Sequence, residues 1–164
     1  MKVVNRHSRS FSAPPEVVGQ LLDTLATGED ALWPVERWPA MRFDRPMAVG
    51  AEGGHGPIRY TVEVHEPGRR VVFRFTGPKG FHGTHWFAMD AHGPSTELHH
   101  TIEMRVTGRA RLTWPAVFRP LHDALLEDAL DKAEAGLAGE VWHPRPLGWW
   151  VRALRRVLAS PSQR

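Results

Sequence analysis

The sequence predicts an α+β fold in which a curved antiparallel sheet of six or seven strands wraps around one long C-terminal helix. Two observations predict this fold. Four strand patterns, in which apolar and polar residues alternate, lie between residues 58 and 106, and a long amphipathic helix pattern follows at 114–138. A curved sheet with a helix across its concave face usually encloses a pocket. The order of the elements therefore predicts a protein that binds something in a cavity.

The composition predicts one domain with an appendage. The chain has 164 residues, a net charge of +3 and no cysteine, which excludes disulfides and thiolate metal sites. It has no apolar run of 18 residues and no apolar signal core near its N-terminus, so we expect a soluble cytoplasmic protein. Most of the arginines alternate with acids and form no basic stripe with aromatic residues, so we expect no nucleic-acid partner.

The first elements are a strand and two short helices. Residues 3–11 predict the strand, and the prolines in Ser12–Glu16 suit the first turn of a helix over 14–25. Residues 27–40 predict a second short helix and a loop, and 41–49 predict a weak strand. The apolar stripe of the first helix consists of Val17, Val18, Leu21, Leu22 and Leu25.

A glycine-rich segment, 50–56, separates these elements from the main sheet. No helix pattern follows it, so it is not a nucleotide-binding fingerprint, and we expect a flexible loop near the mouth of the pocket. The strands at 58–65, 70–76 and 96–106 each have one apolar and one polar face, which favours antiparallel pairing. Short turn sequences join them: Pro67-Gly68, Gly77-Pro78-Lys79-Gly80 and Gly93-Pro94-Ser95.

The C-terminal third predicts two helices. In the long helix over 114–138, Pro115 fits the first turn, whereas Pro120 predicts a kink or a break because it removes a backbone hydrogen bond. Residues 146–158 predict a basic amphipathic helix that packs on its own domain or on a second copy, with binding to an anionic membrane surface as the less favoured alternative. We therefore expect a ligand-binding domain over 1–139 and a basic amphipathic extension over 140–164.

The order of these parts resembles the START-like superfamily, also called SRPBCC, over residues 3–138. The matching features are Ser12–Val18 after the first strand, the stretch from Tyr60-Thr61-Val62 to Glu66–Arg70, and the closing helix. The resemblance implies a helix-grip fold with a hydrophobic cavity between the sheet and the last helix. It implies no single activity, because the superfamily includes polyketide cyclases, lipid-transfer domains and pollen-allergen-like proteins.

The alternating patterns turn a group of aromatic and polar residues toward this cavity. In the first strand Phe11 marks the inward face, which places Arg9 and His7 on the same side. The predicted ligand-binding residues are Tyr60, Phe73, Phe75, His85, Phe87, His100, Met104, Trp114, Phe118 and His122. Imidazoles and one phenol inside an apolar shell suit an amphipathic ligand.

The inward histidines allow three interpretations. Each is most simply a core residue, and each is also a candidate ligand contact or acid–base group, so His85, His100, His122 and Tyr60 are the candidate catalytic residues. A zinc site made by the three histidines lacks any local ligand spacing, so we predict no metal site and no cofactor. On the long helix, Asp123 and Glu127 share one side, which most simply faces solvent, with pairing of Glu127 to an arginine of the sheet as the less favoured alternative.

Three functions remain open. The first is binding of a hydrophobic or aromatic small molecule of lipid-like or polyketide-like character. The second is a polyketide cyclase, aromatase or dehydratase that uses the pocket histidines. The third is a membrane-surface or protein-interaction module, including a homodimer, that uses the helix at 146–158.

Overall fold

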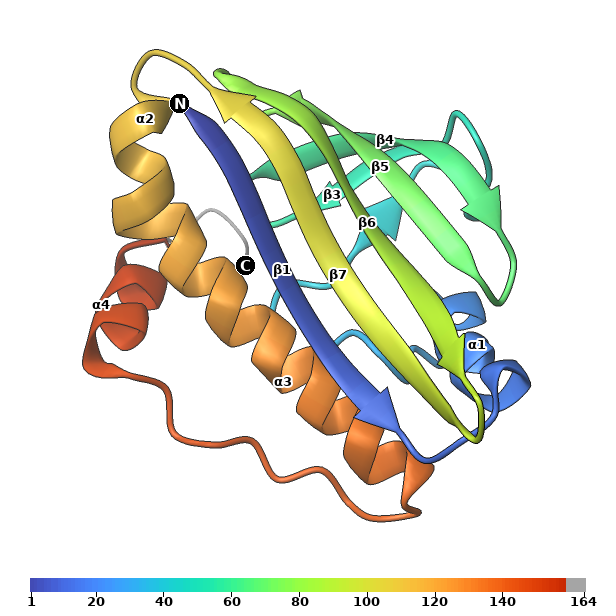
Figure 1. The fold of residues 1–164 in the computed structure, drawn as a ribbon. Helices are drawn as coiled ribbons and strands as arrows, with labels where there is room; N and C mark the ends of the chain where they lie inside the picture. Colours follow the sequence, from blue (N-terminus) through green and yellow to red (C-terminus); the bar gives the residue numbers. More distant parts are fainter. Residues whose placement is uncertain (159–164) are drawn as a thin grey trace.

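The computed structural model describes residues 1–158 and contains a seven-stranded antiparallel sheet with a long helix running along it (Figure 1). The helix-grip α+β fold expected from the sequence is therefore confirmed. The strands are β1 (Lys2–Phe11), β2 (Arg42–Phe43), β3 (Glu52–His55), β4 (Ile58–Glu66), β5 (Arg70–Gly77), β6 (Phe81–His92) and β7 (Ser95–Val106). The helices are α1 (Pro15–Asp23), α2 (Ala110–Thr113), η1 (Trp114–Phe118), α3 (Arg119–Leu137) and α4 (Trp149–Leu158).

The sheet has the strand order β1-β7-β6-β5-β4-β3-β2, so neighbours in the chain are neighbours in the sheet except where β1 pairs with β7. That pairing places His7 opposite His100. Pairing of β6 with β7 places His85 opposite Ile102 and Phe87 opposite His100. The predicted inward positions of Tyr60, His85 and His100 are confirmed, because all three are buried. The polar face predicted for 96–106 is only partly correct, because His99 and Thr101 on that face are buried as well.

The segment between α1 and β2 differs from the prediction, because it forms turns in place of a second short helix. The Asp30 carboxylate accepts hydrogen bonds from the backbone N–H groups of Ala26, Leu32 and Trp33. An aspartate that satisfies nearby N–H groups in this way competes with helix formation. These turns bury Trp33 against the sheet and α3.

The glycine-rich segment also differs from the prediction, because residues 52–55 form strand β3 and only 42–43 of the weak strand at 41–49 is a strand. Glycine is required there by close backbone approach. A Cβ on Gly54 would lie 2.0 Å from the carbonyl oxygen of Ile58, and one on Gly53 would lie 2.2 Å from that of Arg42. The segment is therefore a tightly packed part of the sheet.

The long helix contains an irregularity just before Pro120, where a π-turn (η1) lies between α2 and α3. The N–H of Arg119 bonds to the carbonyl of Trp114, five residues earlier. Pro120 has no N–H to offer the carbonyl of Ala116, and the indole N–H of Trp150 bonds to that oxygen at 2.9 Å. The proline thus produces a π-turn beside it, and the helix itself continues through Pro120 to Leu137.

Helix α4 packs on its own domain, as the favoured interpretation of the tail expected. Leu154 is buried, and the guanidinium of Arg155 lies 4.7 Å from the centre of the Trp38 ring. The division at residue 139 stays a prediction, and residues 159–164 of the extension lie outside the described residues. No helix within 1–158 is long and apolar enough to cross a membrane.

Candidate functional site

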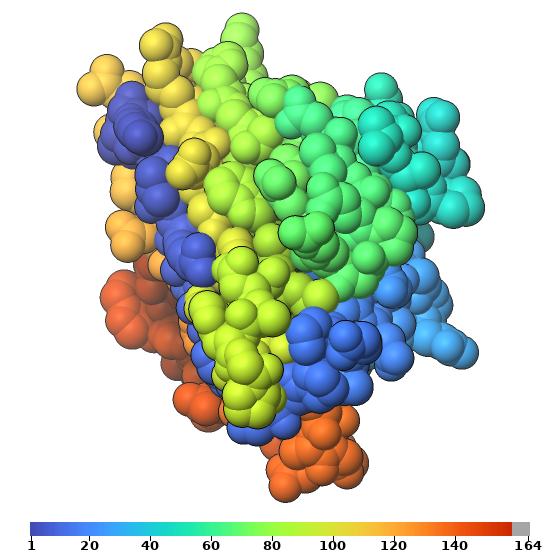
Figure 2. Space-filling view, turned by 45° about the vertical axis from the view of Figure 1, so that its right-hand side comes forward, coloured from blue at the N-terminus to red at the C-terminus, as the bar shows by residue number. Residues whose placement is uncertain are grey.

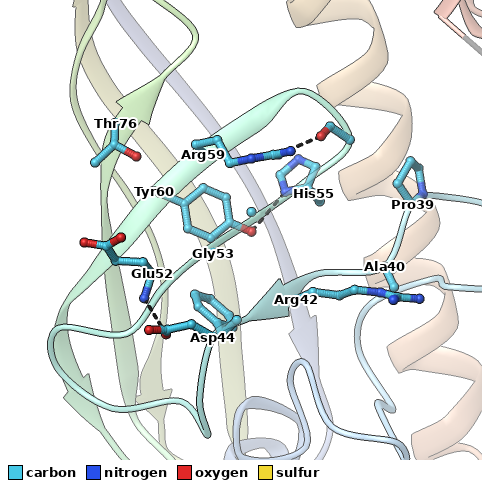
Figure 3. A pocket seen from close by; sticks show the side chains of 13 residues that line it. Pro39, Ala40, Arg42, Asp44, Glu52, Gly53, His55, Arg59, Tyr60 and Thr76 are labelled. Atoms are coloured by element: carbon cyan, nitrogen blue, oxygen red, sulfur yellow. Dashed lines mark hydrogen bonds between the residues drawn. The ribbon is translucent and has the colours of Figure 1, made fainter. Parts of the chain in front are cut away.

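A pocket of about 1030 Å³ lies at the sheet edge formed by β2, β3 and β4 (Figure 3). In the surface view the cyan segment around residues 40–55 projects beside the green strands at this edge (Figure 2). The lining residues are Pro39, Ala40, Arg42, Phe43, Asp44, Glu52, Gly53, Gly54, His55, Gly56, Arg59, Tyr60 and Thr76. They combine aromatic surface with two arginines and two acids, so the pocket suits a ligand with both apolar and polar parts.

A hydrogen-bonded pair, Tyr60 and His55, lies within this pocket lining. The distance between the Tyr60 hydroxyl and His55 Nδ1 is 3.0 Å, and the His55 ring also packs on Trp33 at 4.8 Å between centroids. Burial lowers the pKa of His55 to about 3 and raises the pKa of Tyr60 well above its ordinary value. Both groups are therefore neutral near pH 7 and act as hydrogen-bonding groups.

A line of imidazoles, here called the histidine row, starts at His55 in the pocket and continues on the other side of Tyr60. Its members, in order, are His55, His85, His100, His122 and His7. The Tyr60 and His85 rings meet edge to face at 4.8 Å. His85 Nδ1 lies 3.1 Å from His100 Nε2, a hydrogen bond between two buried imidazoles. The His100 and His122 rings follow at 5.0 Å between centroids. The row thus leads from the pocket across the sheet to α3.

The row ends at His7, which lies between two carboxylates of α3. His7 Nε2 is 3.0 Å from Asp123 Oδ1, and its Nδ1 is 2.8 Å from Glu127 Oε1. The hydrogen bond to Asp123 raises the pKa of His7 against the effect of burial, with a further contribution from Glu127. Within residues 1–158, His7, His122 and Asp123 are also the group whose ligating atoms lie close enough to hold a metal ion.

The middle of the row is neutral and incompletely hydrogen-bonded. Burial lowers the pKa values of His85 and His100 well below the ordinary histidine value, and it lowers that of His122 as well. His85 Nε2, His100 Nδ1 and both ring nitrogens of His122 are buried without a hydrogen-bond partner. Each such group costs about 1–3 kcal/mol, so a purely structural role does not account for the arrangement.

Of the ten predicted ligand-binding residues, only Tyr60 lines this pocket. Phe73 and Phe75 flank His85, with ring centroids 4.9 and 4.7 Å away. The others lie farther inside, packed against the core or the histidine row: Phe87, His100, Met104, Trp114, Phe118 and His122. The structure therefore divides the predicted residues: Phe73 and Phe87 share a core cluster with Tyr60, whereas Met104 and Trp114 belong to a second cluster against which Phe118 packs.

Sequence reasoning missed His55 in the pocket. It placed His7 on the inward face of the first strand but did not predict its contacts with the α3 carboxylates. His55 lies in the glycine-rich segment, for which a loop was expected. The turn signal Gly56-Pro57 directly after it would have placed His55 on a hairpin with β4. The prediction that Glu127 faces solvent or pairs with an arginine of the sheet is resolved. Glu127 binds both Arg9, at 3.3 Å, and His7.

No protein-family model matches the chain, and no curated protein matches its sequence. Solved structures do match its fold. CalU16 from Micromonospora echinospora is 12% identical over 96% of this chain and 92% of that chain, with a TM-score of 0.56. A point mutant of norcoclaurine synthase from Thalictrum flavum, in complex with a transition-state analogue, is 14% identical over 84% of this chain and 97% of that chain, with a TM-score of 0.61.

Ara h 8.0201 is 9% identical over 85% of this chain and 100% of that chain, with a TM-score of 0.56. These three neighbours are START-like helix-grip proteins. The predicted resemblance is therefore confirmed, and at these identities it is the fold that the chains share.

Proposed function

We propose that this chain, which has the START-like helix-grip fold, binds a small hydrophobic or aromatic molecule that carries oxygen atoms. The pocket beside Tyr60 and His55 is the binding site. Its volume of about 1030 Å³ is at the upper end of the range of small-molecule pockets. Burial of the ligand's apolar surface drives binding. His55, whose ring is held by its hydrogen bond to the buried Tyr60 hydroxyl, orients the ligand's oxygen atoms.

The single observation that carries this proposal is a neutral phenol–imidazole pair in the lining of a pocket that also has aromatic and glycine walls. Glycines 53 and 54 bring bare backbone to the lining, and Phe43 adds an aromatic surface whose centroid is 5.8 Å from that of Tyr60. Arg42 and Arg59 supply positive charge for a carboxylate or phenolate on the ligand. One neighbour of this fold, the norcoclaurine synthase, holds a transition-state analogue, which supports the choice of a small organic ligand.

The test is native mass spectrometry of protein purified from its own host, followed by titration of the emptied protein with a hydrophobic fluorescent probe. Thr76→Trp fills the pocket from an exposed position of its lining. Ser10→Trp adds the same surface at an exposed position of β1 that is not part of the lining, and serves as the matched control. We expect a bound apolar or aromatic compound, and probe binding that Thr76→Trp weakens at least about tenfold while Ser10→Trp leaves it unchanged.

Two outcomes would contradict the proposal. One is a host-purified protein that carries no small molecule and an emptied protein that takes up no probe. The other is probe binding that both tryptophan variants leave unchanged, since the probe would then bind somewhere other than this pocket.

A second candidate function is acid–base catalysis on the same ligand, as in a polyketide cyclase, aromatase or dehydratase. The observation that favours it is the continuation of the Tyr60–His55 pair into the histidine row. Tyr60→Phe separates the two functions once the ligand is known. A binding protein loses one hydrogen bond and about two- to tenfold in affinity, whereas an enzyme loses about 100-fold or more in turnover.

A further inference from the structure

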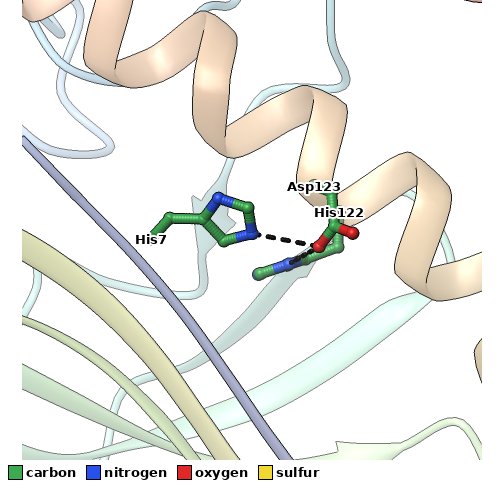
Figure 4. Close-up of side chains that lie close together, drawn as sticks. All are labelled: His7, His122 and Asp123. Carbon is green, nitrogen blue, oxygen red and sulfur yellow. Dashed lines mark hydrogen bonds and ion pairs between the residues drawn. The ribbon is translucent and has the colours of Figure 1, made fainter.

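Three side chains from distant parts of the chain converge between β1 and α3 (Figure 4). His7 projects from β1, whereas His122 and Asp123 project from α3. One ligating atom of each lies within 4.8 Å of the other two. His7 Nε2 is 3.0 Å and His122 Nδ1 is 3.7 Å from the same carboxylate oxygen, Asp123 Oδ1. Donors about 2.0–2.2 Å from one ion are separated by roughly 3–4 Å, so only a small adjustment is needed.

A second observation points independently to a missing ligand. The His122 side chain is only 13% exposed, and both of its ring nitrogens are buried without a hydrogen-bond partner. Asn5 Oδ1, on the same strand as His7, is also buried without a partner. An imidazole nitrogen in such a place needs either a donor, an acceptor or a metal ion.

The surroundings of the three residues fit a metal site as well. His7 bonds through its other nitrogen, Nδ1, to Glu127 at 2.8 Å, which fixes the orientation that presents Nε2 to the cluster. Asn5 Nδ2 donates to Asp123 Oδ1 at 2.9 Å and holds that carboxylate in place. Metal-binding histidines usually have such a carboxylate partner on the second nitrogen.

We propose that His7, His122 and Asp123 bind a divalent transition-metal ion such as Zn²⁺, Co²⁺ or Ni²⁺. Two imidazoles and one carboxylate suit these ions, whereas Ca²⁺ and Mg²⁺ prefer oxygen ligands throughout. Three protein ligands leave at least one coordination position open, and the side chain of Asp123 is 36% exposed, so the ion is within reach of solvent. The site lies at the end of the histidine row farthest from the pocket.

Binding must compete with a proton and with nearby cations. His7 gives up the ring proton that it shares with Asp123, so ion binding releases a proton to solvent. Arg119 lies 3.5 Å from the other oxygen of Asp123 and is 60% exposed, so it can turn outward. Arg9 is held by Glu127, Asp131 and Glu134 one or more turns along α3. These charges set the affinity without occupying the cluster.

The experiment uses the full chain without a histidine tag. Zn²⁺ and Co²⁺ are titrated calorimetrically in two buffers of different ionisation enthalpy, and Co²⁺ binding is also followed by its visible absorption. The variants are His7→Gln, His122→Gln and Asp123→Asn for the ligands and Glu127→Gln for the carboxylate that orients His7. His92→Gln is the matched control, because His92 is an exposed histidine beside another glutamate, Glu97, at 3.8 Å. Thermal unfolding without metal checks that each variant folds.

We expect one ion per chain, and an observed binding enthalpy that differs between the two buffers because the protons released on binding are taken up by the buffer. Each ligand variant should lose binding and the Co²⁺ absorption, Glu127→Gln should weaken binding by about 10–100-fold, and His92→Gln should leave it unchanged. The proposal is overturned if the wild-type chain binds neither ion. Equally, binding that persists in the folded ligand variants, or that His92→Gln removes, would show that the ions bind to surface histidines instead.

Discussion

The carboxylate of Asp128 joins the loop before β2 to the middle of α3. It is 5% exposed and accepts hydrogen bonds from the Trp38 indole N–H at 2.7 Å and from Arg37 at 3.2 Å. Trp38 also carries the guanidinium of Arg155 on its ring. The loop continues directly into Pro39 and Ala40, which line the pocket. One buried charge therefore holds a wall of the pocket and the tail in place.

We predict that Asp128→Ala lowers the free energy of unfolding by about 3–5 kcal/mol. The change leaves the buried indole N–H of Trp38 without its acceptor and removes the carboxylate that pairs with Arg37, whose guanidinium keeps its bond to the Arg145 carbonyl. Breaking a buried charge pair from one side costs about this much. Urea unfolding followed by tryptophan fluorescence measures the loss. Glu140→Ala, at an exposed position, is the control and should change stability by less than about 0.5 kcal/mol. An equally small effect of Asp128→Ala would mean that Trp38 and Arg37 find other partners.

At the start of the long helix, a backbone carbonyl that lacks its partner within the helix is bonded by a side chain of α4. Pro120 withholds the N–H that would bond to the Ala116 carbonyl, and the π-turn places that carbonyl where Trp150 of α4 reaches it. The tail is thus held to the helix by a hydrogen bond to the Ala116 carbonyl, which has no N–H partner at Pro120. This bond adds to the contacts of Leu154 and Arg155 with the domain.

We predict that Trp150→Phe lowers the free energy of unfolding by about 1 kcal/mol, since the ring stays and the hydrogen bond is lost. In a Pro120→Ala background, where residue 120 regains its N–H, the same change should cost clearly less. Trp149→Phe is the matched control, because Trp149 is 73% exposed. Chemical denaturation gives the free energy of unfolding of the wild type, the two single variants and the double variant, which together form a double-mutant cycle for residues 120 and 150. A cost of Trp150→Phe that is independent of residue 120 would contradict the coupling.

Within residues 1–158, several imidazoles are buried and have lowered pKa values. The pKa values of His55 and His85 are lowered by burial, to about 3 for His55, whereas the pKa of His7 is raised by its hydrogen bond to Asp123. Groups with lowered pKa values stabilise the fold fully above their unfolded pKa near 6.5, and this stability is lost as the pH falls below it. His7 acts in the opposite sense, since its contribution is present at low pH and is lost as the pH rises through its raised pKa.

We therefore predict that the melting temperature falls steeply between about pH 6.5 and 5. In this range the unfolded chain binds protons that the buried imidazoles do not, whereas the contribution of His7 is already complete and no longer changes. Each such imidazole adds about 1.4 kcal/mol of lost stability per pH unit in this range. His85→Gln should make the melting temperature depend less steeply on pH, because up to one proton fewer is bound on unfolding. His143→Gln, at an exposed position, should leave this pH dependence unchanged. Differential scanning fluorimetry from pH 8 to 5 measures both. A melting temperature that rises on acidification would show that the imidazoles are protonated in the folded state.

The sequence by itself determined the order of the first strand, the first helix, the main antiparallel strands and the long helix, and it determined which residues of the main strands face the interior around Tyr60, His85 and His100. These follow from local periodicity, because the face of a side chain on a strand or helix depends only on its neighbours in the chain. Tyr60, His85, His100 and the aromatic residues around them could be predicted for this reason. The π-turn was also signalled, by Pro120, although its form was not.

Only the tertiary structure decided which of these residues meet. His7 and Asp123 are separated by 116 positions, and their contact depends on the β1–β7 register and on the rotation of α3 about its axis. His55 reached the pocket because residues 52–55 pair with β4 instead of forming a loop. Register and helix rotation are set by packing over the whole core, and no local pattern of residues contains that information.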